Sequence, residues 1–162
     1  MFYFSVSGGT ILAVGGWDST ITWHPNTESF DLNSNTWLKR DAYPFATSLR
    51  RAPILTIEDV FYIIGGFAPG SSVEVGVQDA PIATFDGNVW SSLGLFNSPR
   101  SSHNAIWLEN RLIVVGGQGD LMTESCNIAN NQTTCTDIGP ILIQYRKYPE
   151  LFIVDSNLCQ NP

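Results

Sequence analysis

One short pattern, repeated three times at an almost constant spacing, constrains the fold of this 162-residue chain more than any other feature. In each copy an apolar run ends in a pair of glycines, as in residues 10–16, 60–66 and 112–117. The pairs begin at positions 15, 65 and 116, so the steps are 50 and 51 residues, which indicates one supersecondary unit used three times. Because each run is unbroken and rich in β-branched residues, it predicts a strand buried on both faces.

Further short strands are predicted around each glycine-ended strand, and no window shows a sustained helical period with caps. The predicted strands of the first unit are residues 2–6, 11–16, 28–32 and 36–38. Those of the second unit are residues 52–57, 60–66, 83–86 and 89–93. Residues 52–57 are expected to be the outer strand of their hairpin. Gly8-Gly9 supplies the positive φ that a tight hairpin turn needs, and Glu58-Asp59 marks the matching turn.

The third unit departs from the other two after its glycine pair. It opens in the same way, with strands at 105–108 and 111–117. Where the first two units carry Phe-Asp, at 30–31 and 85–86, the third carries Cys126-Asn127. Cys135 stands near the place that Trp37 and Trp90 hold in the first two units. Two cysteines are therefore predicted to take the place of an aromatic pair.

Charge and composition exclude several classes of partner. Hydrophobic residues make up 43% of the chain and charged residues 14%, which suits a packed core rather than disorder. The formal net charge of −7 disfavours binding to nucleic acid or to an anionic membrane. No apolar stretch approaches the ~20 residues of a membrane helix, so membrane insertion is not expected. The first nine residues lack the basic start of a typical secretion signal.

These motifs resemble kelch repeats over about residues 1 to 138. The family pattern is an apolar strand ending in Gly-Gly, then a variable loop, an aromatic-plus-Asp strand, and Trp. The residues that match it here, all with expected structural roles, are Gly15, Gly16, Trp37, Gly65, Gly66, Trp90, Gly116 and Gly117. The resemblance implies an all-β fold of about three four-stranded antiparallel β-propeller blades. The expected boundaries are 1–47, 48–98 and 99–138 for the blades, followed by a tail at 139–162.

Three blades cannot close a ring, because propellers have about 4–8 blades. An open arc would expose apolar blade faces and strand edges. Two arrangements avoid this: the chain is the C-terminal half of a longer six-blade protein, or two copies associate into one ring. The first is favoured because Cys159 is left over, and an odd cysteine indicates a partner elsewhere.

Cys126 and Cys135 are separated by eight residues, which suits a cross-strand disulfide that closes a hairpin. The alternative is a pair of buried free thiols in a cytosolic protein. Asn131 between them begins an N-x-S/T sequon, a candidate glycosylation site. The cysteines and the tail, from Tyr148 to Cys159, are also similar to the C-terminal ends of secreted invertebrate kelch-repeat proteins. That similarity implies secretion to the extracellular space.

Few residues point to chemistry. No C-x-x-C, P-loop or catalytic signature is present, and His24 and His103 are isolated, so neither a catalytic nor a metal residue nor a cofactor is predicted. Trp17, Arg51 and Arg100 are possible loop contacts, the two arginines at places where kelch repeats often carry Arg. Packing on a neighbouring Trp or bonding to loop carbonyls is the alternative role for these arginines and for Arg50.

The leading functional hypothesis is a non-enzymatic extracellular module that binds a protein or a glycan, or serves in structural assembly. Propeller loops would then present a rigid surface to the ligand. Two alternatives stay open, both carried by the resemblance. The chain is part of a secreted kelch-type copper radical oxidase, or it is an intracellular kelch adaptor or actin-binding protein.

Overall fold

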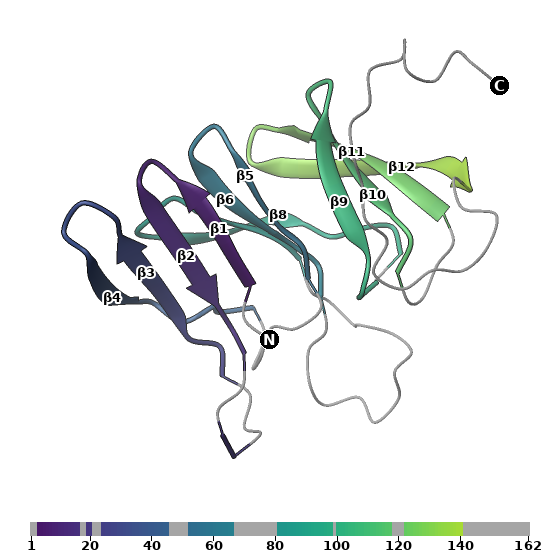
Figure 1. Ribbon diagram of the computed structural model, residues 1–162. Helices are drawn as coiled ribbons and strands as arrows, with labels where there is room; N and C mark the ends of the chain where they lie inside the picture. Colours follow the sequence, from purple (N-terminus) through teal and green to yellow (C-terminus); the bar gives the residue numbers. More distant parts are fainter. Residues whose placement is uncertain are drawn as a thin grey trace, which may run out of the picture.

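The computed structural model describes residues 3–16, 19–20, 24–45, 52–66, 81–98, 100–117 and 122–140. Within these residues the chain forms twelve β-strands and no helix, which confirms the all-β prediction (Figure 1). The strands form three sheets of four, and in each sheet consecutive strands are antiparallel neighbours. Each sheet therefore corresponds to one copy of the sequence repeat.

The strand bounds follow the repeat closely. Sheet 1 consists of β1 (Tyr3–Ser7), β2 (Thr10–Val14), β3 (Thr27–Asp31) and β4 (Thr36–Arg40). Sheet 2 consists of β5 (Ile54–Ile57), β6 (Val60–Ile64), β7 (Ile82–Phe85) and β8 (Trp90–Gly94). Sheet 3 consists of β9 (Asn104–Leu108), β10 (Arg111–Val115), β11 (Met122–Ala129) and β12 (Gln132–Pro140). Because β12 ends at Pro140, the third sheet passes the expected boundary at residue 138.

The cross-strand register shows which residues are equivalent in the three sheets. Phe30 of β3 lies opposite Trp37 of β4, and Phe85 of β7 lies opposite Trp90 of β8. In sheet 3 the matching pair is Cys126 of β11 and Cys135 of β12. The exchange of an aromatic pair for two cysteines, inferred from the sequence, is thus an exchange at the same structural position.

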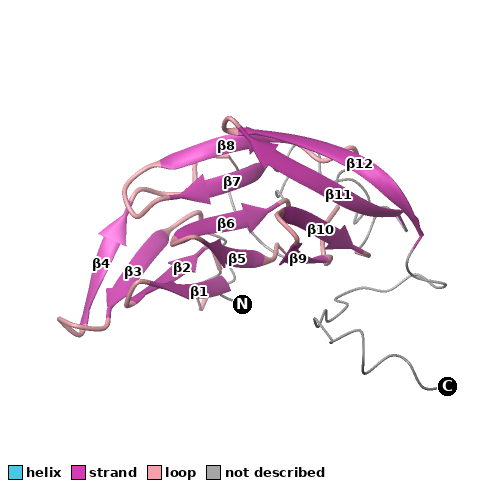
Figure 2. Cartoon of the chain, turned by 90° about the horizontal axis from the view of Figure 1, so that it is seen from above, coloured by secondary structure: helices cyan, strands magenta, loops and turns pink. Residues whose placement is uncertain are grey.

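The three sheets lie side by side in an arc (Figure 2). Their first strands β1, β5 and β9 are neighbours on the inner side, whereas β4, β8 and β12 lie along the outer, convex side. The prediction that residues 52–57 form an outer strand is therefore wrong. β5 is the inner strand of its sheet, because it packs between β1 and β9 rather than at the rim.

The core consists of two apolar layers, one between sheets 1 and 2 and one between sheets 2 and 3. The buried side chains of the first layer are Leu12, Val14, Tyr43, Ala52, Phe61, Ile63, Ala83 and Phe85. Those of the second layer are Ile64, Ile82, Leu93, Phe96, Ala105, Leu112, Val114 and Cys126. We call the face of a sheet toward the preceding sheet in the arc its leading face, and the opposite face its trailing face.

Burial on both faces, predicted for all three glycine-ended strands, is wrong for the first strand. In β2 the trailing-face residues Leu12 and Val14 are fully buried, whereas Ile11 and Ala13 on the leading face are only half-buried. The described residues contain no sheet that precedes sheet 1. The apolar residues of a strand indicate which of its faces can be buried, but a face is buried only where a neighbouring sheet packs against it.

Asp31 and Asp86 cap the turns that follow their strands. One carboxylate oxygen of Asp86 accepts hydrogen bonds from the backbone N–H groups of Asn88 and Val89, both at 2.8 Å. The Val89 and Asn88 donors lower the pKa of the Asp86 carboxyl, because they stabilise its charged form. Asp31 makes the same contacts with Asn33 and Ser34. Each Asp side chain thus stabilises the turn that follows its strand.

Both glycines of every pair adopt positive φ, which explains why the motif is Gly-Gly. The first has φ between 63° and 71° and the second between 100° and 111°. Crowding adds a second reason at Gly117, where an ideal Cβ would lie 2.7 Å from the carbonyl oxygen of Ser101 and 2.7 Å from Cβ of His103. The backbone of the inter-sheet linker therefore approaches β10 at a distance that only glycine permits.

We expect Gly117→Ala to lower the free energy of unfolding by about 2–4 kcal/mol, because strain at positive φ adds to a clash with backbone. Gly139→Ala is the matched control. Gly139 has φ +103°, close to +100° at Gly117, but an added Cβ meets nothing within 4 Å. Urea denaturation of both variants measures the difference, and equal losses would contradict the close-approach explanation.

Candidate functional site

The two edges of the arc differ in the segments that connect the strands. The hairpin turns that join the first to the second and the third to the fourth strand of each sheet lie on one edge (Figure 1). The connections that follow the glycine pairs, and the linkers from sheet to sheet, leave from the opposite edge, which we call the loop edge. Longer and more variable connections on a rigid scaffold are the usual carriers of function in such folds.

Backbone hydrogen bonds fix the bases of these connections. The N–H of Gly15 donates to the carbonyl oxygen of Asn26 at 2.8 Å, and Gly65 donates to Pro81 at 3.3 Å. The N–H of Gly66 donates to the carbonyl oxygen of Arg100 at 3.4 Å, which ties sheet 2 to the linker into sheet 3. The loop edge is therefore anchored at matching places in different sheets.

The linker from sheet 1 to sheet 2 docks on Trp90. The indole N–H of Trp90 donates to the carbonyl oxygen of Asp41 at 3.0 Å. Tyr43 packs edge-on against Trp90, with ring centroids 5.1 Å apart, and is itself buried. Burial raises the pKa of the Tyr43 hydroxyl well above its ordinary value, so Tyr43 stays neutral. The predicted structural role of Trp90 has this physical basis.

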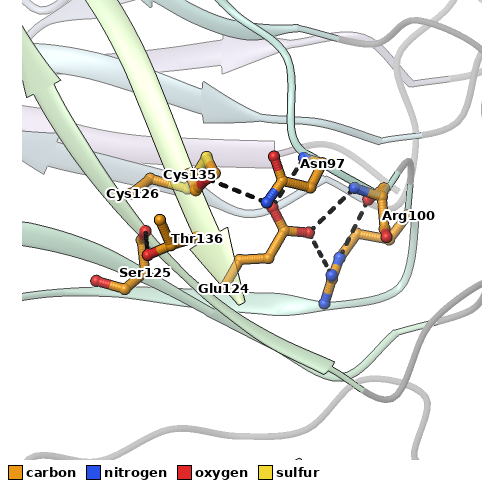
Figure 3. Close-up of a disulfide and its surroundings, with 8 residues drawn as sticks. Asn97, Arg100, Glu124, Ser125, Cys126, Cys135 and Thr136 are labelled. Carbon is orange, nitrogen blue, oxygen red and sulfur yellow. Dashed lines mark hydrogen bonds and ion pairs between the residues drawn. A yellow bond between two sulfur atoms is a disulfide. The ribbon is translucent and has the colours of Figure 1, made fainter. Parts of the chain in front are cut away.

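The linker from sheet 2 to sheet 3 docks on a buried carboxylate (Figure 3). Glu124 of β11 forms an ion pair with Arg100, and both side chains are fully buried. The two carboxylate oxygens also accept from the backbone N–H of Asn97 at 3.0 Å and of Ser98 at 3.3 Å. A buried charge is tolerated only when it is paired and hydrogen-bonded, and both conditions hold here.

Arg100 was expected to be a possible ligand contact in a loop, and the structure corrects this. Its exposed fraction is 1%, and its guanidinium also donates to the carbonyl oxygen of Met122 at 2.6 Å. The alternative role, bonding to loop carbonyls, is the one observed. No sequence motif predicts the pair of Arg100 and Glu124, because the repeat has Ala83 in sheet 2 at the position that Glu124 holds in sheet 3. The one sequence feature that could have indicated it is a carboxylate on an otherwise apolar face of the strand.

His103 packs between the glycine pair of sheet 2 and the glycine pair of sheet 3. An added Cβ on Gly65 would lie 3.2 Å from its ring, and one on Gly117 would lie 2.7 Å from its Cβ. Burial, followed by the nearby positive charge of Arg100, lowers the pKa of His103 to about 3. The imidazole is therefore uncharged near neutral pH and serves packing rather than acid–base chemistry.

The predicted disulfide between Cys126 and Cys135 is present (Figure 3). The side-chain amide of Asn97 donates to the carbonyl oxygen of Cys135 at 3.1 Å, so the linker again docks on the fourth strand, as it does at Trp90. Glu124, Cys126 and Cys135 have the right atoms for a metal and lie close together. In this state both sulfurs are bonded to each other and the carboxylate is paired with Arg100.

The remaining predicted residues are placed as follows. Asn131 lies exposed in the two-residue turn between β11 and β12, with φ 57°. Trp37 lies on the leading face of sheet 1 and is 56% exposed, although its equivalent Trp90 is half-buried. Trp17 and Arg51 lie outside the described residues, as do Arg50 and the tail with Cys159.

A cleft that no sequence motif predicted lies between sheets 1 and 2. It is near the edge that carries the hairpin turns, which we call the turn edge. Its volume is about 270 Å³, and its lining includes Arg40, Asp59 and Asp86 together with Phe61 and Phe85. The guanidinium Nε of Arg40 donates to the hydroxyl of Ser29 at 2.8 Å. Because the lining residues come from two repeats, no local pattern could have grouped them.

Three four-stranded meanders lie side by side in an arc with their first strands innermost, which is the arrangement of neighbouring blades in a β-propeller. Residues 4–39 match the kelch motif family model. The solved structure of YjhT is similar with a TM-score of 0.64 at 15% sequence identity, over 83% of this chain and 44% of that chain. At this identity the likeness shows the fold alone. This chain spans less than half the length of that protein's chain.

No curated protein matches the sequence. Nothing helical in the described part of the chain is long and apolar enough to cross a membrane.

We expect Arg100→Met to lower the free energy of unfolding by about 3–5 kcal/mol, because it leaves the Glu124 carboxylate buried without its counter-charge. The double variant Arg100→Met/Glu124→Leu should recover more than half of that loss, since an apolar pair removes both desolvation costs. Urea denaturation at pH 7 measures both. Arg111→Met, at an exposed arginine, is the control. A single variant as stable as the control would contradict the framework role of the pair.

Lowering the pH should destabilise the protein through His103. The unfolded state takes up a proton below pH ~6.5, whereas the folded state does not until about pH 3, so stability falls as pH falls through this window. Between pH 7 and pH 5 the loss from His103 is about 2 kcal/mol. His103→Gln should flatten the pH dependence of stability by this amount. Unchanged pH dependence in the variant would show that the imidazole is not buried.

Proposed function

We propose that this chain is part of a non-enzymatic propeller that binds a protein or a glycan ligand through its loop edge. The observation that carries the proposal is the contrast between the two edges. On the loop edge, backbone hydrogen bonds at Gly15, Gly65 and Gly66 hold the bases of the connections in place. Anchored bases lower the entropy that loops lose on binding, which is how a rigid scaffold supports affinity.

The connection between β6 and β7 is the strongest candidate for ligand contact. It includes residues 67–80, whereas the hairpins of the opposite edge turn in two or a few residues. Connections of this length are uncommon in compact domains, and many of them carry function. Trp17, next to Gly16 in the corresponding connection of sheet 1, is proposed as a second contact, and Arg51 in the linker before β5 as a third.

The described ionisable groups near the loop edge support a binding role rather than a catalytic one. Arg100 and Glu124 neutralise each other in the interior, and His103 is held neutral by burial. The oxidase alternative relies on a Tyr–Cys pair and histidine ligands. Cys126 and Cys135 are joined to each other, which leaves neither for such a pair.

An extracellular location, as in the secreted kelch-repeat proteins that the sequence resembles, is part of the proposal. It is supported by the disulfide, since such bonds persist in oxidising compartments and are rare in the cytosol. The exposed position of Asn131 at a hairpin tip also leaves its sequon accessible. An intact mass of the native protein with no glycan and two free thiols would favour the intracellular adaptor.

The purified chain should bind a subset of probes on an array of extracellular proteins and an array of glycans. Trp17→Ala, and replacement of residues 67–80 by a Gly/Ser segment of equal length, should each weaken binding at least tenfold if these residues contact the ligand. Glu109→Gln on the turn edge is the matched control and should bind like the unmodified chain. Binding to neither array, or equal loss in the control, would overturn the proposal.

A further inference from the structure

The leading face of sheet 1 is an interface without its partner. The register places Ile11, Ala13, Glu28, Phe30 and Trp37 on this face. Their equivalents in sheet 2 are Phe61, Ile63, Ala83 and Phe85, all buried, and Trp90, half-buried. On sheet 1 the apolar members are only half-buried, Glu28 is exposed, and the indole of Trp37 is 56% exposed. The surface resembles a covered face, but no described segment covers it.

The two covered leading faces show what such a face receives. In both, a linker leaves the fourth strand of the preceding sheet and forms a hydrogen bond with one residue of the fourth strand of the covered sheet. That residue is Trp90 in sheet 2 and Cys135 in sheet 3. Asp41 accepts from Trp90, and Asn97 donates to Cys135. In sheet 3 the linker also supplies Arg100 to the Glu124 carboxylate. Arg100 is the sixth residue after Gly94, the last residue of β8.

Glu28 occupies the position in sheet 1 that Glu124 occupies in sheet 3. Glu28 lies opposite Ala13 on β2, and Glu124 lies opposite Val114 on β10. Two residues further along the same strands lie Phe30 and Cys126, each of which pairs with the fourth strand. The leading face of sheet 1 therefore combines the tryptophan of sheet 2 with the carboxylate of sheet 3. A linker that carries an arginine would match it.

Such a linker is present in the sequence directly after sheet 3. Arg146 is the sixth residue after Pro140, the last residue of β12, as Arg100 is the sixth after Gly94. The residues just after β12, Ile141 and Leu142, are apolar, as are Leu95 and Phe96 after β8. The spacing and chemistry of residues 141–146 therefore match the linker that docks on sheet 3.

We propose that the leading face of sheet 1 binds residues 141–146 of a second copy of this chain, with Arg146 paired with Glu28 and apolar side chains packed on Phe30 and Trp37. This contact is the sheet 2 to sheet 3 junction repeated between two chains. Two copies that each donate this segment to the other extend both arcs toward one ring, and such a head-to-tail contact closes with twofold symmetry.

The charges near Glu28 set the strength of this contact. Lys39 lies directly opposite Glu28 on β4 and both side chains are exposed, so water screens the attraction between their charges. An arginine that arrives with an apolar linker brings desolvation, which strengthens its attraction to the carboxylate beyond that of a solvated lysine. The pairing should weaken at high salt less than a surface ion pair does.

Sedimentation velocity of the purified chain between 1 and 100 μM tests the proposal, with the expected species having twice the mass of the single chain. Glu28→Arg and Arg146→Glu should each weaken association on the order of tenfold or more, because each places like charges together. The charge-swapped double variant Glu28→Arg/Arg146→Glu should restore it. Glu109→Arg is the control, since it makes the same charge change at an exposed turn on the other edge.

A single chain at all concentrations would overturn the proposal, as would association that Glu28→Arg leaves unchanged or that the swap does not restore. Thermal unfolding of each variant separates lost association from lost folding. The inference is independent of the proposed function, because the array measurement reports on the loop edge whether or not two chains associate.

Discussion

The packing of apolar side chains between the facing sides of neighbouring sheets is the constraint on which the rest of this structure depends. A four-stranded meander with apolar residues on each side needs a partner against each face, and here the facing sides of neighbouring sheets cover one another. Leu12 and Val14 are fully buried because sheet 2 lies against them, and Ile64 and Ile82 because sheet 3 does. The glycine pairs serve the same end, since they let the linkers pass close enough to the strands for the sheets to meet.

The two junctions between sheets solve one packing problem with different chemistry. Between sheets 1 and 2 the linker packs its own Tyr43 against an aromatic surface made by Trp90 and Phe85. Between sheets 2 and 3 the same positions hold a disulfide and a buried ion pair. A buried ion pair is weak support for stability compared with an apolar pair of similar volume. Its geometric demands are stricter, however, so it fixes the path of the linker that crosses it.

Local patterns were sufficient to predict the disulfide, the strands of the first two sheets and the first hairpin of the third. The Gly-Gly motif needs positive φ at both residues, and Cys126 and Cys135 fall in the register of Phe30 and Trp37, so each could be inferred from neighbours in sequence. The placement of β5 as an inner strand and the burial of Arg100 could not. Arg100 is neutralised by a residue 24 positions later, in another strand. Trp37 and Trp90 share one motif but differ in exposure, because exposure depends on the adjacent sheet and not on the motif.

The disulfide in place of an aromatic pair also affects how the arc comes apart. In sheets 1 and 2 the outermost strand is attached to its neighbour only by hydrogen bonds and ring packing, whereas in sheet 3 it is fastened covalently. Fraying should therefore begin at β4, where Trp37 is more exposed than Trp90 is in β8, and end at β12. The arc therefore has a built-in direction of melting, from β4 in sheet 1 to the cross-linked β12 in sheet 3.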